Sequence, residues 1–166
     1  MADHPGVLVT LDGQLHDPQV PFLHADDLAA VRGDGIFETL LVRDGRPCLL
    51  EAHLSRLAHS AQLVDLPEPE ASQWHTAVDV AVDAWLAGGE QEGVLRLVYS
   101  RGREHGSAPT AYATIGAVPG RVADLRRHGL AALTLDLSAT TSLEDALATI
   151  KFLQENQVKV EVLGYV

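Results

Sequence analysis

The chain has 166 residues, of which 46% are hydrophobic, and its formal net charge at pH 7 is −11. This length is enough for one domain, or for one domain and part of a second, with a sizeable buried core. The acidic balance disfavours nucleic acid and anionic membranes as partners, because both require a basic surface.

The only cysteine, Cys48, excludes an internal disulfide. It follows Pro47 in an apolar run, so we expect a small buried hydrophobic side chain rather than a reactive thiol. No segment resembles a signal peptide, and none is long and apolar enough to cross a bilayer. Together these features predict a cytoplasmic protein.

The N-terminal part predicts short strands joined by loops. Residues 7–10 are apolar and predict a strand, and the Asp12-Gly13 pair predicts the turn that reverses it. Residues 16–21 carry two prolines and predict a loop. Residues 23–32 predict one short helical turn.

The densest signals lie in residues 33–60. Gly33-Asp34-Gly35 predicts a turn, and the apolar, partly β-branched run 36–42 predicts a strand. Asp44-Gly45 between two apolar runs predicts a hairpin turn. From Leu50 onward, hydrophobic residues recur at helical spacing and predict one buried stripe. The stripe consists of Leu50, Leu54, Leu57, Ala61 and Val64, and a neighbouring face carries His53, Arg56 and Ser60.

Residues 67–118 predict a second helix followed by strands. Pro67 and Pro69 end the first helix, Ser72 is a candidate N-cap for the second, and Gly88-Gly89 stops it. Its predicted buried face consists of Trp74, Ala77, Val78, Ala81 and Trp85. Strands are predicted at 94–100, 111–118 and 130–137, with a glycine-rich loop at 101–109.

The tail predicts a helix at 142–153 and an alternating strand at 158–162. The whole pattern predicts an α+β fold: a two-layer sandwich with a mixed, mostly antiparallel sheet, two packed helices and a C-terminal helix–strand unit. We expect one domain at residues 1–137 and an extension at 138–166 that packs on it.

Three segments resemble the N-terminal domain of the class IV (fold-type IV) pyridoxal-phosphate enzymes. They are GDGIFETL at 33–40, LLEAHLSRLAHSA at 49–61 and VLRLVYSRG at 94–102. That family includes branched-chain and D-amino acid aminotransferases and 4-amino-4-deoxychorismate lyase. The resemblance implies an aminotransferase or lyase, with the lyase branch as first choice, and pyridoxal 5′-phosphate as cofactor. It also implies an amino acid or aminodeoxychorismate as substrate.

The resemblance implies roles for Arg56 and Phe37. Arg56 matches the arginine that contacts the cofactor phosphate, and a guanidinium suits that ligand. From periodicity alone, a solvated arginine on the helix surface is the better interpretation. Phe37 matches an aromatic residue that lines the substrate pocket, while a phenylalanine in an apolar strand is equally well a core residue.

Three further residues are candidates for substrate binding. Arg96 interrupts an apolar strand and therefore needs a carboxylate partner or a route to water. The resemblance places Arg96 near the substrate, and a structural ion pair is the equal alternative. Arg103 and His105 resemble an Arg-x-His carboxylate clamp of the D-amino acid aminotransferases, although a solvated loop is the favoured interpretation.

Lys151 is the candidate catalytic residue. Residues 150–154, IKFLQ, resemble the segment that carries the cofactor-binding lysine in lyase-type members. The resemblance implies that Lys151 attacks the cofactor as a neutral amine and then moves protons as a general base and acid. The local pattern favours a solvated lysine beside the apolar stripe of an amphipathic helix.

Three hypotheses for the function stay open. In the family, a second domain supplies most of the phosphate contacts, so we expect this chain by itself to lack the cofactor domain and to be inactive. The alternative is a truncated, recombined or engineered stand-alone α+β domain without activity. The third is an interaction module that forms a homodimer through an apolar sheet edge. The sequence predicts no metal site.

Overall fold

The computed structural model describes residues 6–106, 108–129, 148 and 151. The chain divides into two compact units, Met1–Ala123 and Asp124–Val166. The predicted strands at 130–137 and 158–162, the domain boundary at 137 and most of the predicted tail helix lie outside the described residues.

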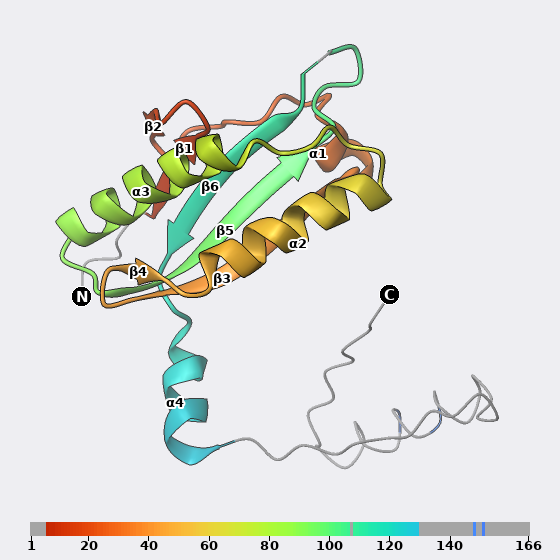
Figure 1. Ribbon diagram of the computed structural model, residues 1–166. Coiled ribbons are helices and arrows are strands. Elements are labelled where there is room, and N and C mark those ends of the chain that lie inside the picture. Colours follow the sequence, from red (N-terminus) through yellow and green to blue (C-terminus); the bar gives the residue numbers. More distant parts are fainter. Residues whose placement is uncertain (1–5, 107, 130–147, 149–150, 152–166) are drawn as a thin grey trace. The chain divides into compact units, whose positions relative to one another are not determined.

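The first unit is built on one sheet with the strand order β2-β1-β6-β5-β3-β4 (Figure 1). The strands are β1 (Val7–Thr10), β2 (Leu15–His16), β3 (Gly35–Arg43), β4 (Arg46–Pro47), β5 (Glu92–Ser100) and β6 (Thr110–Gly116). All of the pairings between these described strands are antiparallel. The longest runs from Gly35 opposite Ser100 to Arg43 opposite Glu92.

Two helices cover one face of this sheet, α2 (Leu50–Leu63) and α3 (Ala71–Ala87) (Figure 1). The short helix α1 (Leu28–Arg32) precedes β3, and α4 (Gly120–His128) follows β6 along the chain. The arrangement of sheet and covering helices confirms the predicted α+β two-layer fold.

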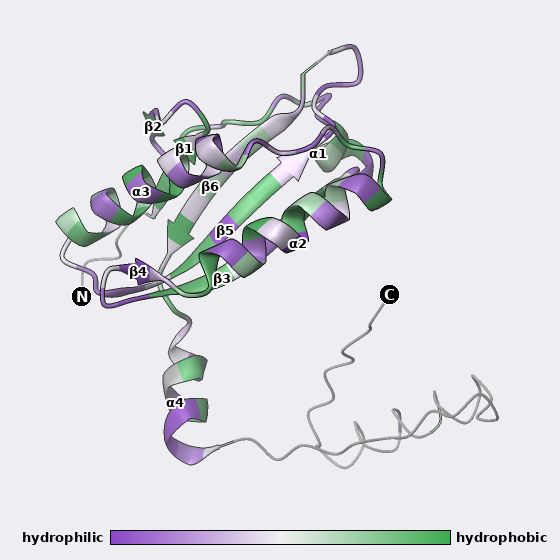
Figure 2. Ribbon diagram, in the orientation of Figure 1, coloured by the Kyte–Doolittle hydropathy of each residue, from purple (hydrophilic) through white to green (hydrophobic). Residues whose placement is uncertain are grey.

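The core lies between the sheet and the two covering helices. Trp74 and Trp85 of α3 are fully buried, as are Leu95 and Leu97 of β5. Figure 2 shows that α2 and α3 carry both hydrophilic and hydrophobic residues, as expected for helices with one buried face. A Cβ atom on Gly93 would lie 2.7 Å from a side-chain carbon of Ile115, so only glycine fits at this point of the core.

Several details of the helices differ from the sequence-based expectations. Helix α3 begins one residue before Ser72, and its N-cap is Glu70. Ser72 donates a hydrogen bond to Oε1 of Glu70 instead of capping the helix. Val64 follows the last residue of α2 and is 40% exposed, so it does not extend the buried stripe.

Two further expectations were wrong or incomplete. Cys48 is a free thiol of intermediate burial rather than a buried core residue, because it precedes the exposed Leu49 at the start of α2. The sequence analysis did not predict α4, whose nine residues are rich in charge and include only two large apolar side chains, Val122 and Leu125. Among the described residues, no helix has the length and hydropathy required to cross a bilayer.

Candidate functional site

A cluster of three charged or titratable side chains joins β3 to α2. Strand alternation turns Glu38 toward the helices, where its side chain is 5% exposed. Arg56 donates from Nε to Oε1 of Glu38 at 2.7 Å and from Nη2 to Oε2 at 2.5 Å. His53 lies one turn earlier on α2, and its Nδ1 is 2.8 Å from Oε2 of Glu38. A buried carboxylate therefore holds an arginine by both oxygens.

The hydrogen bonds of this cluster fix the tautomer of His53. Glu38 in its ionised form only accepts hydrogen bonds, and the Arg56 guanidinium only donates them. His53 therefore carries a proton on Nδ1 and donates it to Glu38. His53 Nδ1 and Arg56 Nη2 are 3.3 Å apart, but both are then donors, so this contact is not a hydrogen bond. Nε2 of His53 makes no hydrogen bond to another residue in the described part of the chain.

The cluster keeps both charges of the ion pair. Burial acts to raise the pKa of Glu38, but the hydrogen bonds and positive charge of Arg56, together with His53, outweigh it and the pKa is lowered. The hydrogen bonds to Glu38 and its negative charge raise the pKa of Arg56 in turn. Arg56 is thus a permanently charged guanidinium held by a buried carboxylate, with 64% of its side chain exposed.

Phe37 and Arg96 lie together on the opposite face of the sheet. Phe37 pairs with Val98 and Thr39 pairs with Arg96, so these four side chains share the face that α2 and α3 do not cover. The Arg96 guanidinium carbon is 5.2 Å from the centre of the Phe37 ring, which is a cation–π distance.

The exposure of the two residues bears on their alternatives. Phe37 is 62% exposed, so the interpretation as a core residue was wrong. Arg96 is exposed and contacts an aromatic ring, and it forms no ion pair with another described residue, while its place near a substrate stays a prediction. Arg56 of α2 contacts Glu38 on the covered face of the sheet, whereas Phe37 lies on the open face.

The loop after β5 carries Arg103 and His105. The Nε atom of Arg103 is 2.9 and 3.1 Å from the two carboxylate oxygens of Asp26, and this contact lowers the pKa of Asp26. His105 is exposed. The two residues are thus close in the chain, but Arg103 is fixed by a neighbouring carboxylate.

One buried carboxylate closes the base of this loop. Asp27 is 1% exposed and accepts hydrogen bonds from the hydroxyls of Ser100 at 3.0 Å and Thr110 at 2.6 Å, which lie at the two ends of the loop. It also caps α1 by accepting from the backbone of Ala29 at 3.0 Å. Asp27 therefore ties α1, β5 and β6 together where the loop begins and ends.

Lys151 belongs to the second unit. It has helical conformation and an exposed side chain, as does Ala148 one turn earlier. These observations agree with the predicted helix in the tail. The catalytic role of Lys151 stays a prediction.

The sequence analysis placed His53 and Arg56 on one helix face but missed their partner Glu38. The available signal was a carboxylate at the position of an apolar strand where alternation points toward the predicted helix. Asp27 was missed as well, because its partners Ser100 and Thr110 lie more than seventy positions away. Among the described residues, no group of side chains could hold a metal ion.

Comparison with known proteins adds a family to this geometry. A family model described as class IV amino-transferase matches residues 35–158, which include Glu38, His53 and Arg56. The chain belongs to the class IV aminotransferase family. This confirms the resemblance carried by the GDGIFETL and LLEAHLSRLAHSA segments.

This class IV aminotransferase chain has a curated relative in Mycobacterium tuberculosis, a bifunctional aminodeoxychorismate lyase / D-amino acid transaminase. The two are 60% identical over 141 residues, a match that covers 85% of this chain and 49% of the relative. The chain thus spans about half the length of that relative.

Solved structures show the same fold. A hypothetical aminotransferase from Mycobacterium tuberculosis in a PLP-bound form superposes with a TM-score of 0.78 at 50% identity, covering 92% of this chain and 59% of the other. A fold IV transaminase from Curtobacterium pusillum gives a TM-score of 0.66 at 37% identity, covering 69% and 43%.

Proposed function

We propose that this chain forms part of a pyridoxal-phosphate-dependent class IV aminotransferase or aminodeoxychorismate lyase, in which Arg56 binds the cofactor phosphate. The observation that carries the proposal is the pair of hydrogen bonds that Arg56 donates to the carboxylate of Glu38. It holds a permanently charged guanidinium in one orientation at the surface of α2. Family membership supports the cofactor class, since a family relative has been solved in a PLP-bound form.

The exposed part of Arg56 fits a phosphate group. Nε and Nη2 face Glu38, and Nη1 makes no hydrogen bond to another described residue. A phosphate oxygen at Nη1 would therefore receive a charge-assisted hydrogen bond without displacing the ion pair. Glu38 balances the charge of Arg56, however, so this contact alone gives weak binding, and a complete site requires further donors.

The remaining candidates have distinct proposed roles. Pyridoxal phosphate supplies an electron sink that stabilises negative charge on the substrate carbon. Phe37 and Arg96 offer an aromatic ring and a cation on the open sheet face, which suit a substrate with an apolar part and a carboxylate. Arg103 and His105 are proposed as a second carboxylate contact, and Lys151 as the amine that exchanges protons with the substrate.

We propose that residues 1–166 by themselves do not catalyse either reaction. Arg56 is the one phosphate contact proposed among the described residues, and the chain spans about half the length of its curated relative. The alternative is a stand-alone domain without a cofactor role. Weak phosphate binding at Arg56 separates the two, because a stand-alone domain of the family that has lost the cofactor role does not require a phosphate contact there.

The experiment is an NMR titration of the chain with pyridoxamine 5′-phosphate, which lacks the aldehyde that reacts with surface lysines. We expect saturable shifts of the Arg56 Nε–H and His53 signals in the millimolar range. Pyridoxamine without the phosphate serves as the matched ligand control, and Arg56→Leu as the variant control. Equal shifts with pyridoxamine, or unchanged binding in Arg56→Leu, would refute the assignment of Arg56.

Activity assays address the second part of the proposal. Residues 1–166 incubated with pyridoxal phosphate are expected to show neither transamination of D-alanine nor pyruvate release from aminodeoxychorismate. Turnover that disappears in Lys151→Ala would overturn the proposed inactivity and would assign Lys151 as the catalytic lysine.

A homodimer through a sheet edge stays a prediction. The edge strands of the described sheet are β2 and β4, with two residues each, and β4 contains Arg46 and Pro47. Short edges with charge and proline are poor templates for strand addition. Sedimentation velocity at high protein concentration tests the prediction, and a strict monomer would contradict it.

A further inference from the structure

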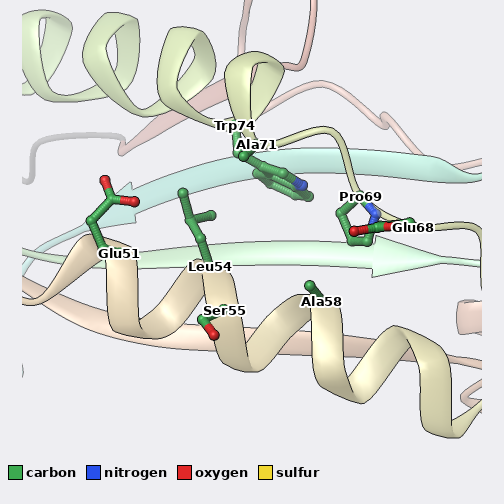
Figure 3. A pocket seen from close by; sticks show the side chains of 8 residues that line it. All are labelled: Glu51, Leu54, Ser55, Ala58, Glu68, Pro69, Ala71 and Trp74. Atoms are coloured by element: carbon green, nitrogen blue, oxygen red, sulfur yellow. The ribbon is translucent and has the colours of Figure 1, made fainter.

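A pocket with a volume of about 240 Å³ lies between α2 and the start of α3 (Figure 3). Leu54 and Ala58 of α2 form one wall, and Pro69 forms part of the other. Trp74 lies at its base, and the carboxylates of Glu51 and Glu68 stand at its rim. This volume is below the range of roughly 300–1,000 Å³ that drug-sized ligands occupy, so the pocket suits a small molecule.

The base of the pocket holds an unpaired hydrogen-bond donor. Trp74 is fully buried, and its Nε1 has no hydrogen-bond partner among the described residues. The other tryptophan of α3, Trp85, donates its Nε1–H to the carbonyl of Glu92 at 3.1 Å. Buried polar groups nearly always have a partner, because leaving one unpaired costs free energy. The acceptor for the indole of Trp74 therefore has to come from water, from a ligand or from residues outside the described ranges.

The geometry directs this donor toward the pocket. Figure 3 shows the nitrogen edge of the Trp74 indole turned toward Pro69 and Glu68, which line one end. The Trp74 indole also packs against Tyr99 in a T-shaped arrangement, with ring centres 6.4 Å apart. Residues 66–70 between α2 and α3 have no regular secondary structure, and the carbonyl of Pro67 accepts a hydrogen bond from the hydroxyl of Tyr99 at 3.2 Å. Because Nε1 of Trp74 is fully buried, an acceptor reaches it only when this wall moves.

The rim favours a positively charged occupant. Glu51 already has a partner, because its Oε1 is 3.2 Å from Nε2 of His75 on α3. Glu68 is exposed and forms no ion pair with another described residue. A ligand that reaches Trp74 with an acceptor would therefore place any ammonium group close to a carboxylate that lacks a cation.

We propose that this pocket is a separate binding site for a small organic cation that carries a carbonyl oxygen. The carbonyl accepts the Nε1–H of Trp74, the methylene chain lies against Leu54 and Ala58, and the ammonium group pairs with Glu68. The site shares no residue with the cluster of Glu38, His53 and Arg56. Binding here is independent of the proposed phosphate contact.

The test uses the indole N–H signal of Trp74 in a ¹H–¹⁵N NMR spectrum, assigned by comparison with Trp85→Phe. N-Acetylputrescine, which carries an amide carbonyl and an ammonium group, is the probe. We expect a saturable downfield shift of the Trp74 signal and none of the Trp85 signal. N-Pentylacetamide has the same carbonyl and length without the charge, and it should bind about threefold more weakly, as the loss of an exposed ion pair predicts.

Two variants complete the test. Glu68→Gln should weaken N-acetylputrescine binding by the same factor of about three. Glu104→Gln, with the same change of charge at a residue that does not line the pocket, should leave it unchanged. Arg56→Leu should also leave it unchanged, which separates this proposal from the proposed phosphate site. A Trp74 signal that stays constant at high concentrations of N-acetylputrescine would overturn the proposal. Equal affinities for N-acetylputrescine and N-pentylacetamide, together with unchanged affinity in Glu68→Gln, would overturn it as well.

Discussion

Replacing Glu38 with glutamine should destabilise the chain by about 1–2 kcal/mol. The buried side chain loses its charge and one of the two oxygens that accept hydrogen bonds from Arg56. A hydrogen bond to a charged group contributes about 1.5–3 kcal/mol, and Arg56 makes two of them to Glu38. The Arg56 side chain is 64% exposed, however, so solvent screening reduces the contribution. The glutamine keeps the shape of the side chain and one acceptor, which limits the loss further.

Urea denaturation at pH 7, followed by circular dichroism, measures this loss. Asp26→Asn is the matched control, since it removes the charge from the pair with Arg103, whose side chains are 31% and 51% exposed. That variant should lose less than about 1 kcal/mol. A Glu38→Gln variant as stable as the wild type would refute the view that the hydrogen bonds between Arg56 and Glu38 stabilise the fold.

The pH dependence gives a second check with a definite sign. The pKa of Glu38 is lowered from 4.5 in the folded chain, so its contribution is complete above about pH 4.5 and is lost as the pH falls through the lower, folded-state pKa. The difference in unfolding free energy between the wild type and Glu38→Gln should therefore be constant from neutral pH down to about pH 4.5 and shrink at lower pH. A gap that grows on acidification would contradict the ionised state assigned to Glu38.

Two further substitutions test the loop after β5. Gly102→Ala should destabilise by about 3 kcal/mol or more in urea denaturation, since φ is +86° and the new Cβ would lie 2.1 Å from the carbonyl oxygen of Ala108. Gly33→Ala, with φ of +70° and open space, should cost only about 1 kcal/mol, and equal losses would contradict the clash. Asp27→Asn should cost about 1–3 kcal/mol, because the amide cannot accept from both Ala29 and Thr110 as the carboxylate does. Hydrogen exchange should then rise in the loop but not in α2, and unchanged exchange would refute the role of Asp27 there.

The parts of the fold that follow from local patterns could be predicted from the sequence. The heptad-like spacing of Leu54, Leu57 and Ala61 correctly identified the buried face of α2, and all three are buried. The stripe from Trp74 to Trp85 did the same for α3. Each of these patterns depends only on residues within the same element, so no knowledge of the partners was required.

The contacts that define the candidate site could not be predicted in the same way. Arg56 was recognisable from its motif, but its partner Glu38 is eighteen positions away and is brought near by the packing of α2 on β3. The exposure of Phe37 depends on which face of the sheet the helices cover, and an apolar strand does not specify this.

The pairing of β3 with β5 has a consequence for the way this chain can change by insertion and deletion. Glu38 and Phe37 are neighbours in the chain, but one serves the covered face of the sheet and the other the open face. Inserting one residue at the start of β3 would move every later side chain of the strand to the opposite face. Glu38 would then face outward, and Phe37 would face the helices. Length changes there are therefore tolerated only in pairs, because an even shift returns each side chain to its own face.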